Sequence, residues 1–459
     1  MSSNHVIGID IGTTTISVIV LNSITGEVID KITEKNDAHI KSNHLWEKTE
    51  DPTLIYNKVN QILDSLIDKY PPISCIGVTG QMHGIVYVNE YGQAVSPLFD
   101  WQDLRGDIEY QEGLSYAQHL SKITGYQLAS GFGMVTHFYN TINRIIPDSA
   151  VYICTVMDYI VMKLCGKTKP LMHPSNAASL GCFNLKTNHF DEKVLKAVNI
   201  ETKYLPHIIE EEYIVGKMRG TIPVSVAIGD NQASFLGSVR DSKEDLLINI
   251  GTSSQISVFT QHHYQLLGVE TRPLTKNSFI MVGSPLCGGK AYALLEKFFN
   301  EVVSLATGSN PNHLYKLMQE LARDYEAVED PLVIATQFSG TREDPSIRGS
   351  ISNLSINNFT PKHFVVGILR GIVEELYSFY QILEPKLKKR PERLIGSGNA
   401  LRLNGALRQM ITHTFNMPLY IPFHHEEASY GAALFALVAS GLYEDLYLAQ
   451  KLIRYTKIS

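Results

Sequence analysis

The sequence predicts an α/β fold divided into two lobes, and three observations lead to this prediction. The chain has 459 residues, whereas a single hydrophobic core stops growing near roughly 250–300 residues. Apolar runs typical of strands alternate with stretches of helical period. One short pattern near the N-terminus also returns past the middle of the chain, so we expect both lobes to begin with the same unit.

The first lobe opens with strands and a helix. Predicted strands, in chain order, cover Val6–Asp10, Ile16–Leu21, a run after the turn Ser23–Gly26, and Ile73–Val78. Before the last strand, apolar residues from Leu54 to Ile67 fall on one helical stripe. Asp51 is placed to cap this helix, and Pro52 occupies its first position. The expected order is three strands, a helix and a strand.

The second lobe repeats the opening of the first. The matching segments are Ile9-Asp10-Ile11-Gly12-Thr13-Thr14-Thr15 and Ile248-Asn249-Ile250-Gly251-Thr252-Ser253-Ser254. A β-rich run follows each segment, as if one unit had been duplicated. A polar stretch from Gly237 to Asp245 separates two apolar strands, so we place the boundary there, with lobes at residues 1–238 and 239–459.

Helix signals also mark the second lobe. Thr360 and Pro361 are placed as the N-cap and first residue of a helix. Further on, a strand at Arg393–Ile395 leads into Gly396–Asn399, and Leu401–Phe415 is predicted to be helical. We therefore expect a glycine-rich loop between a strand and a helix.

The composition is that of an ordinary globular protein. Hydrophobic residues make up 44% and charged residues 19%, and with a formal net charge of −6 no basic patch indicates nucleic-acid binding. The five cysteines have neither disulfide nor zinc spacing, so we expect reduced thiols. Residues 1–5 lack the features of a signal peptide, and no run approaches the ~20 apolar residues of a membrane helix. We expect a cytoplasmic monomer or homodimer without nucleic-acid or membrane partners.

The two Gly-Thr turns are predicted to bind phosphate groups. Glycine lets the backbone approach an anion, and consecutive hydroxyl and amide groups donate to phosphate oxygens. One such turn alone is more often a plain hairpin, but its presence in both lobes favours phosphate binding. The predicted residues are Gly12, Thr13, Thr14, Thr15, Gly251 and Thr252. Asp10 stands beside the first turn and is predicted to hold Mg²⁺, directly or through water.

A carboxylate that can act as a general base follows another apolar strand. The run Val224–Ile228 passes through Gly229 into Asp230. The Asp230 carboxylate can accept a proton from a substrate hydroxyl as that oxygen attacks phosphorus. Alternatively, Asp230 caps the helix that begins near Asn231, and the two roles are compatible.

Polar side chains at two further strand ends suit a polyhydroxylated ligand. The candidates are Gln81, His83, Trp101, Asp103 and Arg105. Hydroxyl groups need paired donors and acceptors, and Trp101 offers an apolar wall. Each residue taken singly is more often structural, so the functional interpretation depends on their clustering.

Other catalytic templates are absent from the sequence. It contains no P-loop, no dinucleotide-binding glycine motif, no His-Glu-x-x-His and no Gly-x-Ser-x-Gly. The run His424–Glu427 could suggest a metal, but a loop at a helix start is the favoured interpretation. Metal-dependent hydrolysis and dehydrogenase chemistry are disfavoured.

Together these motifs resemble those of the FGGY carbohydrate kinases, within the actin-like ATPase fold. The matching segments are Asp10–Thr15, Thr79–Gly84, Trp101–Arg105, Asp158-Tyr159, Leu164–Gly166, Gly229–Gln232, Asn249–Ser253, Gly340–Glu343, Gly396–Asn399 and Glu426–Ala433. The resemblance implies two ribonuclease-H-like lobes with an interlobe cleft for ATP and a sugar. By position, it implies Asp230 as the base, Met82, His83 and Asn231 on the sugar side, and Gly398, Asn399 and Asn404 on the adenosine side.

Within the family, the chain resembles the sedoheptulokinases most, in Ser175–Ser179, Gly229–Ser238 and Asn249–Ser257. Where many relatives carry a lysine, an apolar residue and a tryptophan, this chain has Thr136–Asn140, which disfavours a glycerol kinase or an ordinary xylulokinase. The resemblance implies ATP- and Mg²⁺-dependent phosphorylation of a ketose at a primary hydroxyl, with sedoheptulose first and D-xylulose second. A non-catalytic sugar sensor is the rival from another class.

Overall fold

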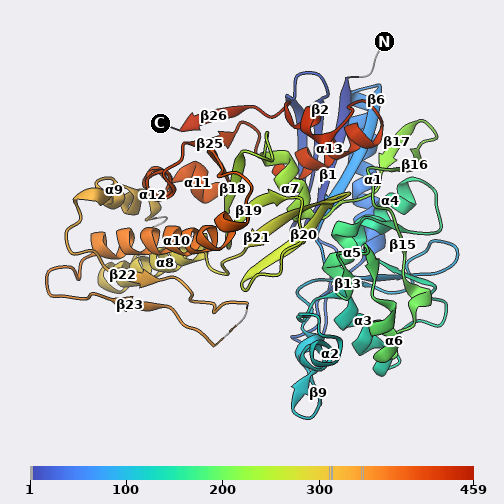
Figure 1. Ribbon diagram of the computed structural model, residues 1–459, viewed down its shortest axis with the longest axis horizontal. Helices are drawn as coiled ribbons and strands as arrows, with labels where there is room; N and C mark the ends of the chain where they lie inside the picture. The colour runs from blue at the N-terminus through green and yellow to red at the C-terminus, as the bar shows by residue number, and fades with distance from the viewer. Residues whose placement is uncertain (1–3, 310, 312–313, 343, 345, 459) are drawn as a thin grey trace. The chain divides into compact units, whose positions relative to one another are not determined.

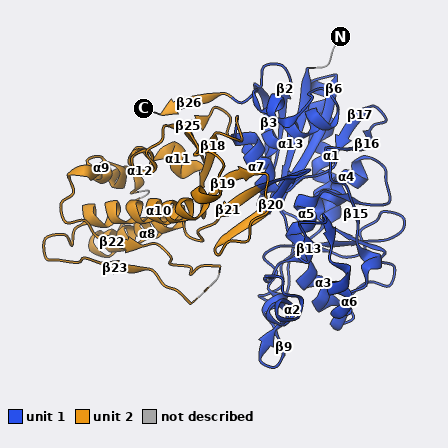
Figure 2. Ribbon diagram, viewed as in Figure 1, with its two compact units in different colours: residues 1–240, 272–279, 426–453 blue, residues 241–271, 280–425, 454–459 orange. Residues whose placement is uncertain are grey.

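The computed structural model describes residues 4–309, 311, 314–342, 344 and 346–458. They form two compact units, each with a mixed sheet and flanking helices (Figures 1 and 2). Unit 1 comprises residues up to 240, 272–279 and 426–453, and unit 2 comprises residues 241–271, 280–425 and those from 454 onward. The first division lies close to the predicted boundary. The predicted contiguous lobes nevertheless differ from the units, because two later segments group with unit 1.

The sheet of unit 1 brings three strand ends to one edge. Its strands, in spatial order, are β16 (Ile214–Met218), β17 (Ile222–Ser225), β6 (Ile73–Gly80), β1 (His5–Ile11), β2 (Thr15–Asn22) and β3 (Val28–Lys35). β1 pairs antiparallel with β2 and parallel with β6, which in turn runs parallel to β17. Parallel strands end at the same edge, so Asp10, Gln81 and the segment before Asp230 emerge there.

The sheet of unit 2 repeats this plan, as the duplicated sequence predicts. Its strands, in spatial order, are β20 (Val269–Thr275), β21 (Ser278–Gly283), β19 (Ser254–Thr260), β18 (Asp245–Ile250), β24 (Arg393–Ser397), β25 (Leu419–Pro422) and β26 (Tyr455–Ile458). β18 pairs antiparallel with β19 and parallel with β24, which runs parallel to β25. The predicted two-lobed α/β fold is confirmed.

The predicted helix starts are confirmed by their caps. Asp51 accepts hydrogen bonds from the N–H groups of Thr53 and Leu54 at the start of α1 (Pro52–Lys69). Thr360 caps α10 (Pro361–Leu383) in the same way, through the N–H of His363. Both caps satisfy N–H groups that have no partner inside the helix.

One predicted helix is wrong in its continuity. The stretch predicted as a single helix is α11 (Asn399–Leu403) followed by α12 (Gly405–Phe415). Between them, Asn404 has extended backbone angles, and its Oδ1 accepts the N–H of Leu407. An asparagine competes with the helix backbone in this way and starts a new helix.

Helix α13 (Glu427–Ala439) explains why residues 426–453 group with unit 1. It packs on β1, β6 and α7 (Asp230–Ser238) (Figure 1). A Cβ on Gly8 would lie 1.8 Å from the Ser429 carbonyl oxygen, and one on Gly77 would lie 1.9 Å from that of Ala432. The helix backbone therefore rests directly on the two central strands, a contact that only glycine permits.

The other elements complete the two units. In unit 1 they are β4 (His39–Ile40), β5 (Thr49–Glu50), β7 (Val86–Val88), β8 (Leu98–Phe99), β9 (Glu109–Gln111), β10 (Leu114–Ser115), α2 (Tyr116–Thr124), α3 (Gly133–Ile142), β11 (Tyr152–Cys154), α4 (Val156–Leu164), β12 (Leu171–Met172), α5 (Pro174–Leu180), β13 (Phe183–Asn184), β14 (His189–Phe190), α6 (Glu192–Ala197), β15 (His207–Ile208) and α14 (Leu446–Gln450). In unit 2 they are α8 (Gly289–Thr307), α9 (Tyr315–Ala322), β22 (Val333–Ala335) and β23 (Ser350–Ser352).

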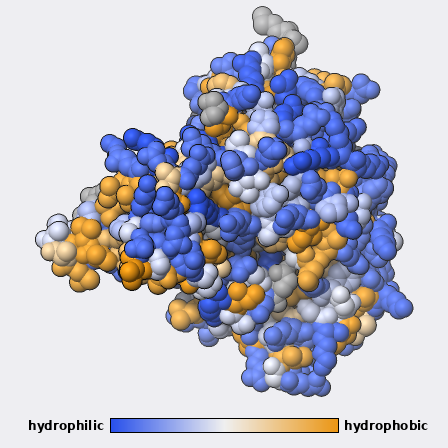
Figure 3. Space-filling view, turned by 60° about the vertical axis from the view of Figure 1, so that its left-hand side comes forward, coloured by the Kyte–Doolittle hydropathy of each residue, from blue (hydrophilic) through white to orange (hydrophobic). Residues whose placement is uncertain are grey.

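The surface and the cysteines match the sequence-based expectations. On the face seen in Figure 3, hydrophilic residues are spread widely, with apolar residues among them. All five cysteines are free thiols, as predicted. Across the described residues, no helix has the length and apolar character needed to cross a membrane.

Candidate active site

The first Gly-Thr turn, between β1 and β2, is held by backbone and side-chain hydrogen bonds. The N–H of Gly12 donates to the Thr15 carbonyl at 2.9 Å. Asn36 fastens the turn again, because its N–H donates to the Thr14 carbonyl (2.8 Å) and its Nδ2 donates to the Gly12 carbonyl (3.0 Å). Thr14 and Thr15 stay exposed, so their hydroxyl groups can reach an anion. This geometry fits the predicted phosphate site.

The second turn, between β18 and β19, is held against the start of α8. The N–H of Gly251 donates to the Ser253 carbonyl at 3.0 Å. The N–H groups of Gly289 and Lys290 donate to the carbonyls of Gly251 and Thr252, each at 2.9 Å. Thr252 and Ser253 are exposed, and so is Lys290, a cationic residue that sequence reasoning missed. Its proximity depends on tertiary packing, which the local pattern does not reveal.

The predicted adenosine-side residues fall into two groups. Gly398 has φ 87° and lies against Ile250, where a Cβ would come within 2.4 Å of the Ile250 carbonyl oxygen. Gly398 and the exposed Asn399 are therefore beside the second turn. Asn404 is only 4% exposed and uses its Oδ1 as the cap of α12. Its visible role is structural.

Asp230 is the first residue of α7, one position before the predicted start, and Gly229 is the N-cap, so the Asp230 side chain does not cap the helix. The segment before Asp230 is fixed by three side chains. The Thr79 hydroxyl donates to the Ile228 carbonyl at 2.8 Å. From α5, the Ser175 hydroxyl accepts the N–H of Gly229 at 3.0 Å, and Nδ2 of Asn176 donates to the Ala227 carbonyl at 3.2 Å. These anchors fix the backbone that leads into Asp230.

Asp10 lies close enough to two other carboxylates, those of Asp230 and Glu426, for their charges to repel it. Burial, and then repulsion from Asp230 and Glu426, raise the pKa of Asp10 to about 7. Burial also raises the pKa of Asp230, while the positive charge of Arg272 and the N–H of Asn231 oppose that rise. Carboxylates that repel one another form a donor set suited to a divalent cation such as the predicted Mg²⁺.

Sequence reasoning missed two of these charges. Glu426 lies just before α13, at a loop leading into a helix, as predicted for that stretch. Its Oε2 accepts the Ser17 hydroxyl at 3.0 Å, and its Oε1 forms an ion pair with Lys31. Arg272 lies on β20. Neither residue stands in a local pattern that marks it, because each reaches Asp10 or Asp230 only through the fold.

Comparisons with known proteins identify the family. Models of the N- and C-terminal domains of the FGGY family of carbohydrate kinases match residues 5–237 and 246–440. The chain belongs to this family. It is 30% identical to human sedoheptulokinase over 393 residues, covering 79% of this chain and 80% of that protein. It is 25% identical to the xylulose kinase of Staphylococcus xylosus, and the match covers 94% of this chain and 90% of that protein.

The fold of this carbohydrate kinase also matches solved structures. The gluconate kinase of Lactobacillus acidophilus superposes with a TM-score of 0.85, covering 99% of this chain and 93% of the other at 20% identity. The match places the chain in the predicted actin-like fold. One segment of the predicted resemblance ends at Glu343, which lies outside the described residues.

In this kinase, Trp101, Thr13 and Gln81 form a chain of hydrogen bonds. Nε1 of Trp101 donates to the Thr13 hydroxyl at 2.9 Å, and that hydroxyl donates to Oε1 of Gln81 at 3.3 Å. Nε2 of Gln81 donates to Glu50 at 2.9 Å. Trp101 is 46% exposed beside the first turn and can offer the predicted apolar wall. Both ends of the Gln81 carboxamide are engaged within the protein, which favours a positioning role over direct sugar binding.

Met82 and His83 lie close to the segment that carries Asp230. The Met82 thioether packs against Gly229. His83 has φ 74° and is held by Ser179, whose hydroxyl accepts its N–H at 3.2 Å and whose carbonyl lies 2.6 Å from Nδ1. Because a carbonyl only accepts, Nδ1 donates in this contact. The position of the His83 ring is therefore fixed by α5, the helix that also anchors the segment before Asp230.

The predicted sugar ligands Asp103 and Arg105 are paired with each other in the interior of unit 1. They are 0% and 1% exposed and form a bidentate ion pair at 2.6 and 3.1 Å. Arg105 also donates to Asn140 at 2.7 Å and lies 4.2 Å from the centre of the Phe99 ring. The guanidinium and carboxylate satisfy each other in the interior, which favours a structural role, and direct sugar binding by this pair stays a prediction.

Asn231, in the first turn of α7, keeps one unsatisfied group. Its Oδ1 is buried and has no hydrogen-bond partner among the described residues. A buried polar atom of this kind costs free energy unless a ligand or water pairs with it. Asn231 is therefore suited to the sugar contact predicted for it.

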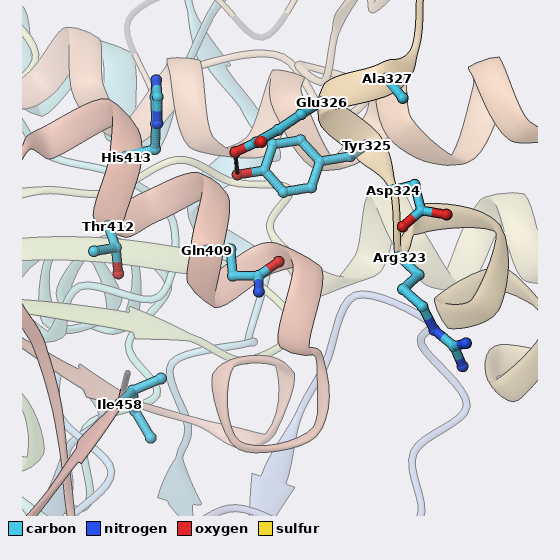
Figure 4. A pocket seen from close by; sticks show the side chains of 9 residues that line it. All are labelled: Arg323, Asp324, Tyr325, Glu326, Ala327, Gln409, Thr412, His413 and Ile458. Carbon is cyan, nitrogen blue, oxygen red and sulfur yellow. Dashed lines mark hydrogen bonds between the residues drawn. The ribbon is translucent and has the colours of Figure 1, made fainter.

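A pocket of about 630 Å³ lies elsewhere in unit 2 (Figure 4). Its lining residues are Arg323, Asp324, Tyr325, Glu326, Ala327, Gln409, Thr412, His413 and Ile458. None of the predicted site residues is among them. The pocket does not mark the candidate active site.

Proposed function

We propose that this carbohydrate kinase transfers the γ-phosphate of ATP to a primary hydroxyl of a ketose, with sedoheptulose as the first candidate. The observation that carries the proposal is the placement of Asp230, anchored at the start of α7 with its charge coupled to those of Asp10 and Arg272. A phosphotransferase needs a fixed carboxylate that can accept the proton of an attacking hydroxyl. We further propose a cytoplasmic location and a monomeric or dimeric state.

Asp230 accepts the hydroxyl proton while the sugar oxygen forms its bond to the γ-phosphorus and the bond from phosphorus to the leaving ADP oxygen breaks. Arg272 favours the ionised carboxylate, because its positive charge lowers the pKa of Asp230 against the effect of burial. The exposed hydroxyl groups of Thr14, Thr15 and Thr252 supply donors to phosphate oxygens. A Mg²⁺ ion near Asp10 would add positive charge for the same oxygens.

Sedoheptulose is the first candidate substrate because the human relative is a sedoheptulokinase. Xylulose is the second candidate because the Staphylococcus xylosus relative is a xylulose kinase. Discrimination between the sugars requires differences in single hydrogen bonds, and sites that bind a hydroxyl reject ligands lacking it. Asn231 provides one such acceptor through its buried, unsatisfied Oδ1. We expect sedoheptulose to give the highest kcat/KM in a panel with xylulose, ribulose and glycerol.

The substitution Asp230→Asn tests the proposed base. It keeps the size of the side chain but removes proton acceptance, so we expect kcat to fall about 10²–10⁴-fold with little change in the sugar KM. Asp148→Asn, at an exposed aspartate, is the matched control. Near-wild-type turnover by the Asp230→Asn enzyme would exclude the assigned role. Binding of ketoses without any phosphorylation by the wild-type protein would favour the sugar sensor.

A further inference from the structure

A second group of titratable side chains lies in unit 1, outside the carboxylates around Asp230. His39, Glu50 and Asp100 each offer one ligand atom, and the three atoms lie within 4.8 Å of one another. Backbone pairing creates this group, because β4, β5 and β8 are neighbours in one small sheet. His39 on β4 stands opposite Glu50 on β5, and Asp100 directly follows β8.

The two carboxylates of this group are buried and only half satisfied. Glu50 is 0% exposed and Asp100 is 1% exposed. Oε2 of Glu50 accepts hydrogen bonds from Asn36 (3.1 Å) and Gln81 (2.9 Å), and Oδ1 of Asp100 accepts the N–H of Gln102 at 2.6 Å. Oε1 of Glu50 and Oδ2 of Asp100 have no hydrogen-bond partner among the described residues. Each carboxylate thus has one oxygen fixed and one oxygen available.

The negative charges of the two buried carboxylates favour binding of a cation. Burial raises the pKa of Glu50, and burial together with the Glu50 charge raises the pKa of Asp100 to about 6. The imidazole of His39, with Nδ1 3.5 Å from Oε1 of Glu50, is half exposed. Two buried carboxylates side by side are costly unless they are paired, protonated or bound to a metal.

We propose that His39, Glu50 and Asp100 form a binding site for one divalent transition-metal ion of the zinc or manganese class. One imidazole nitrogen and two carboxylate oxygens are a common donor set for these ions. Asn36, Gln81 and Gln102 supply the outer hydrogen bonds that orient metal-binding carboxylates. The exposed His39 side chain marks the solvent side of the site.

The spacing needs only a small closure. Ligand atoms around a bound Zn²⁺ lie about 3–4 Å apart, given bonds of about 2.0–2.2 Å, compared with spacings up to 4.8 Å here. The half-exposed His39 side chain can supply this movement. A bound ion would also stiffen two neighbours of the active site, since Glu50 holds Gln81 and Asp100 precedes Trp101. The site does not depend on the proposed sugar kinase reaction.

Calorimetric titration of the nucleotide-free, full-length protein with Zn²⁺, and separately with Mn²⁺, tests the proposal. We expect one saturable ion per chain. Affinity should fall at least about 10–100-fold in His39→Gln and further in Asp100→Asn. His44→Gln, at an exposed histidine of the same connecting segment, is the matched control. Asp10→Asn should leave the affinity unchanged, which separates this site from the Mg²⁺ site proposed at Asp10.

Circular dichroism establishes that each variant is folded, and His39→Gln, at an exposed residue, keeps the test valid if Asp100→Asn is unstable. Saturable binding that is equally tight in wild type, His39→Gln and Asp100→Asn would place the ion elsewhere among the 16 histidines and overturn the proposal. Absence of saturable binding of either ion would also overturn the proposal. It would mean that one carboxyl group of Glu50 and Asp100 is protonated in the folded protein. Binding of Mg²⁺ in preference to both ions would refute the proposed metal class.

Discussion

The thioether of Met82 occupies the space beside Gly229, where a Cβ on residue 229 would lie 2.7 Å from both Sδ and Cε of Met82. Gly229 has an ordinary φ of −64°, so the close approach, and not a special backbone conformation, requires glycine here. Because Asp230 follows directly, this contact ties the position of the proposed base to a residue on the sugar side.

We predict that Gly229→Ala lowers kcat about 10–100-fold, since the added methyl group would meet Gln232 Oε1 at 2.6 Å as well as the Met82 thioether, and small misplacements of a base are costly. Crowding should also lower the free energy of unfolding by about 1–3 kcal/mol. Steady-state kinetics and urea unfolding measure both effects. Gly405→Ala is the control, because its Cβ would meet no atom closer than 3.8 Å. Unchanged turnover in Gly229→Ala would show that Met82 yields without moving Asp230.

The buried ion pair of Asp103 and Arg105 gives a second prediction. Asp103→Asn leaves the Arg105 charge in the interior without its carboxylate, so we expect the free energy of unfolding to fall by about 3–5 kcal/mol. The enzyme that remains folded at low temperature should keep the wild-type sugar KM. The exposed pair of Asp64 and Arg219 is the comparison, since Asp64→Asn should cost less than about 1 kcal/mol. A stable Asp103→Asn enzyme with a raised sugar KM would restore the role in sugar binding.

Local sequence patterns were sufficient for the elements that carry the site. The two Gly-Thr turns, the capped helices at Pro52 and Pro361, and the start of α7 at Asp230 each depend on residues within a few positions of one another. Such features follow from alternation, capping and glycine placement. Their duplication in the sequence also predicted the strand-turn-strand unit that opens each sheet's part of the chain.

The rest depended on burial and on distant contacts. Asp103 and Arg105 have the residue types of a sugar site, and only the packing of Phe99 and other rings around Arg105 shows that they face the interior. Glu426 lies more than 400 positions from its partner Ser17, and no period or spacing links them. The group of His39, Glu50 and Asp100 is equally hidden, because strand pairing alone brings it together.

His173 provides a pH prediction for the same framework. It caps α5, the helix whose Ser175 and Asn176 hold the segment before Asp230, by accepting the Ser175 N–H on Nδ1 at 3.2 Å. Burial lowers the pKa of His173 from 6.5 to about 3, because the charged ring is excluded from the interior. The unfolded chain therefore binds a proton that the folded protein refuses. The contribution of the neutral His173 to the free energy of unfolding is therefore complete above pH 6.5 and is lost as the pH falls toward 3.

We predict that His173→Asn, which keeps a capping side chain but cannot titrate in this range, is less stable than wild type at pH 7 because it leaves a cavity. The difference should shrink as the pH falls from 6.5 toward 3, by up to about 1.4 kcal/mol per pH unit. Urea unfolding at several pH values measures it, and His189→Asn, on the exposed end of β14, should retain the wild-type slope. Parallel pH profiles for wild type and His173→Asn would contradict the prediction. They would mean that the imidazole takes up its proton in the folded protein, through local opening of the α5 cap. The anchors of Asp230 would then loosen before the rest of unit 1.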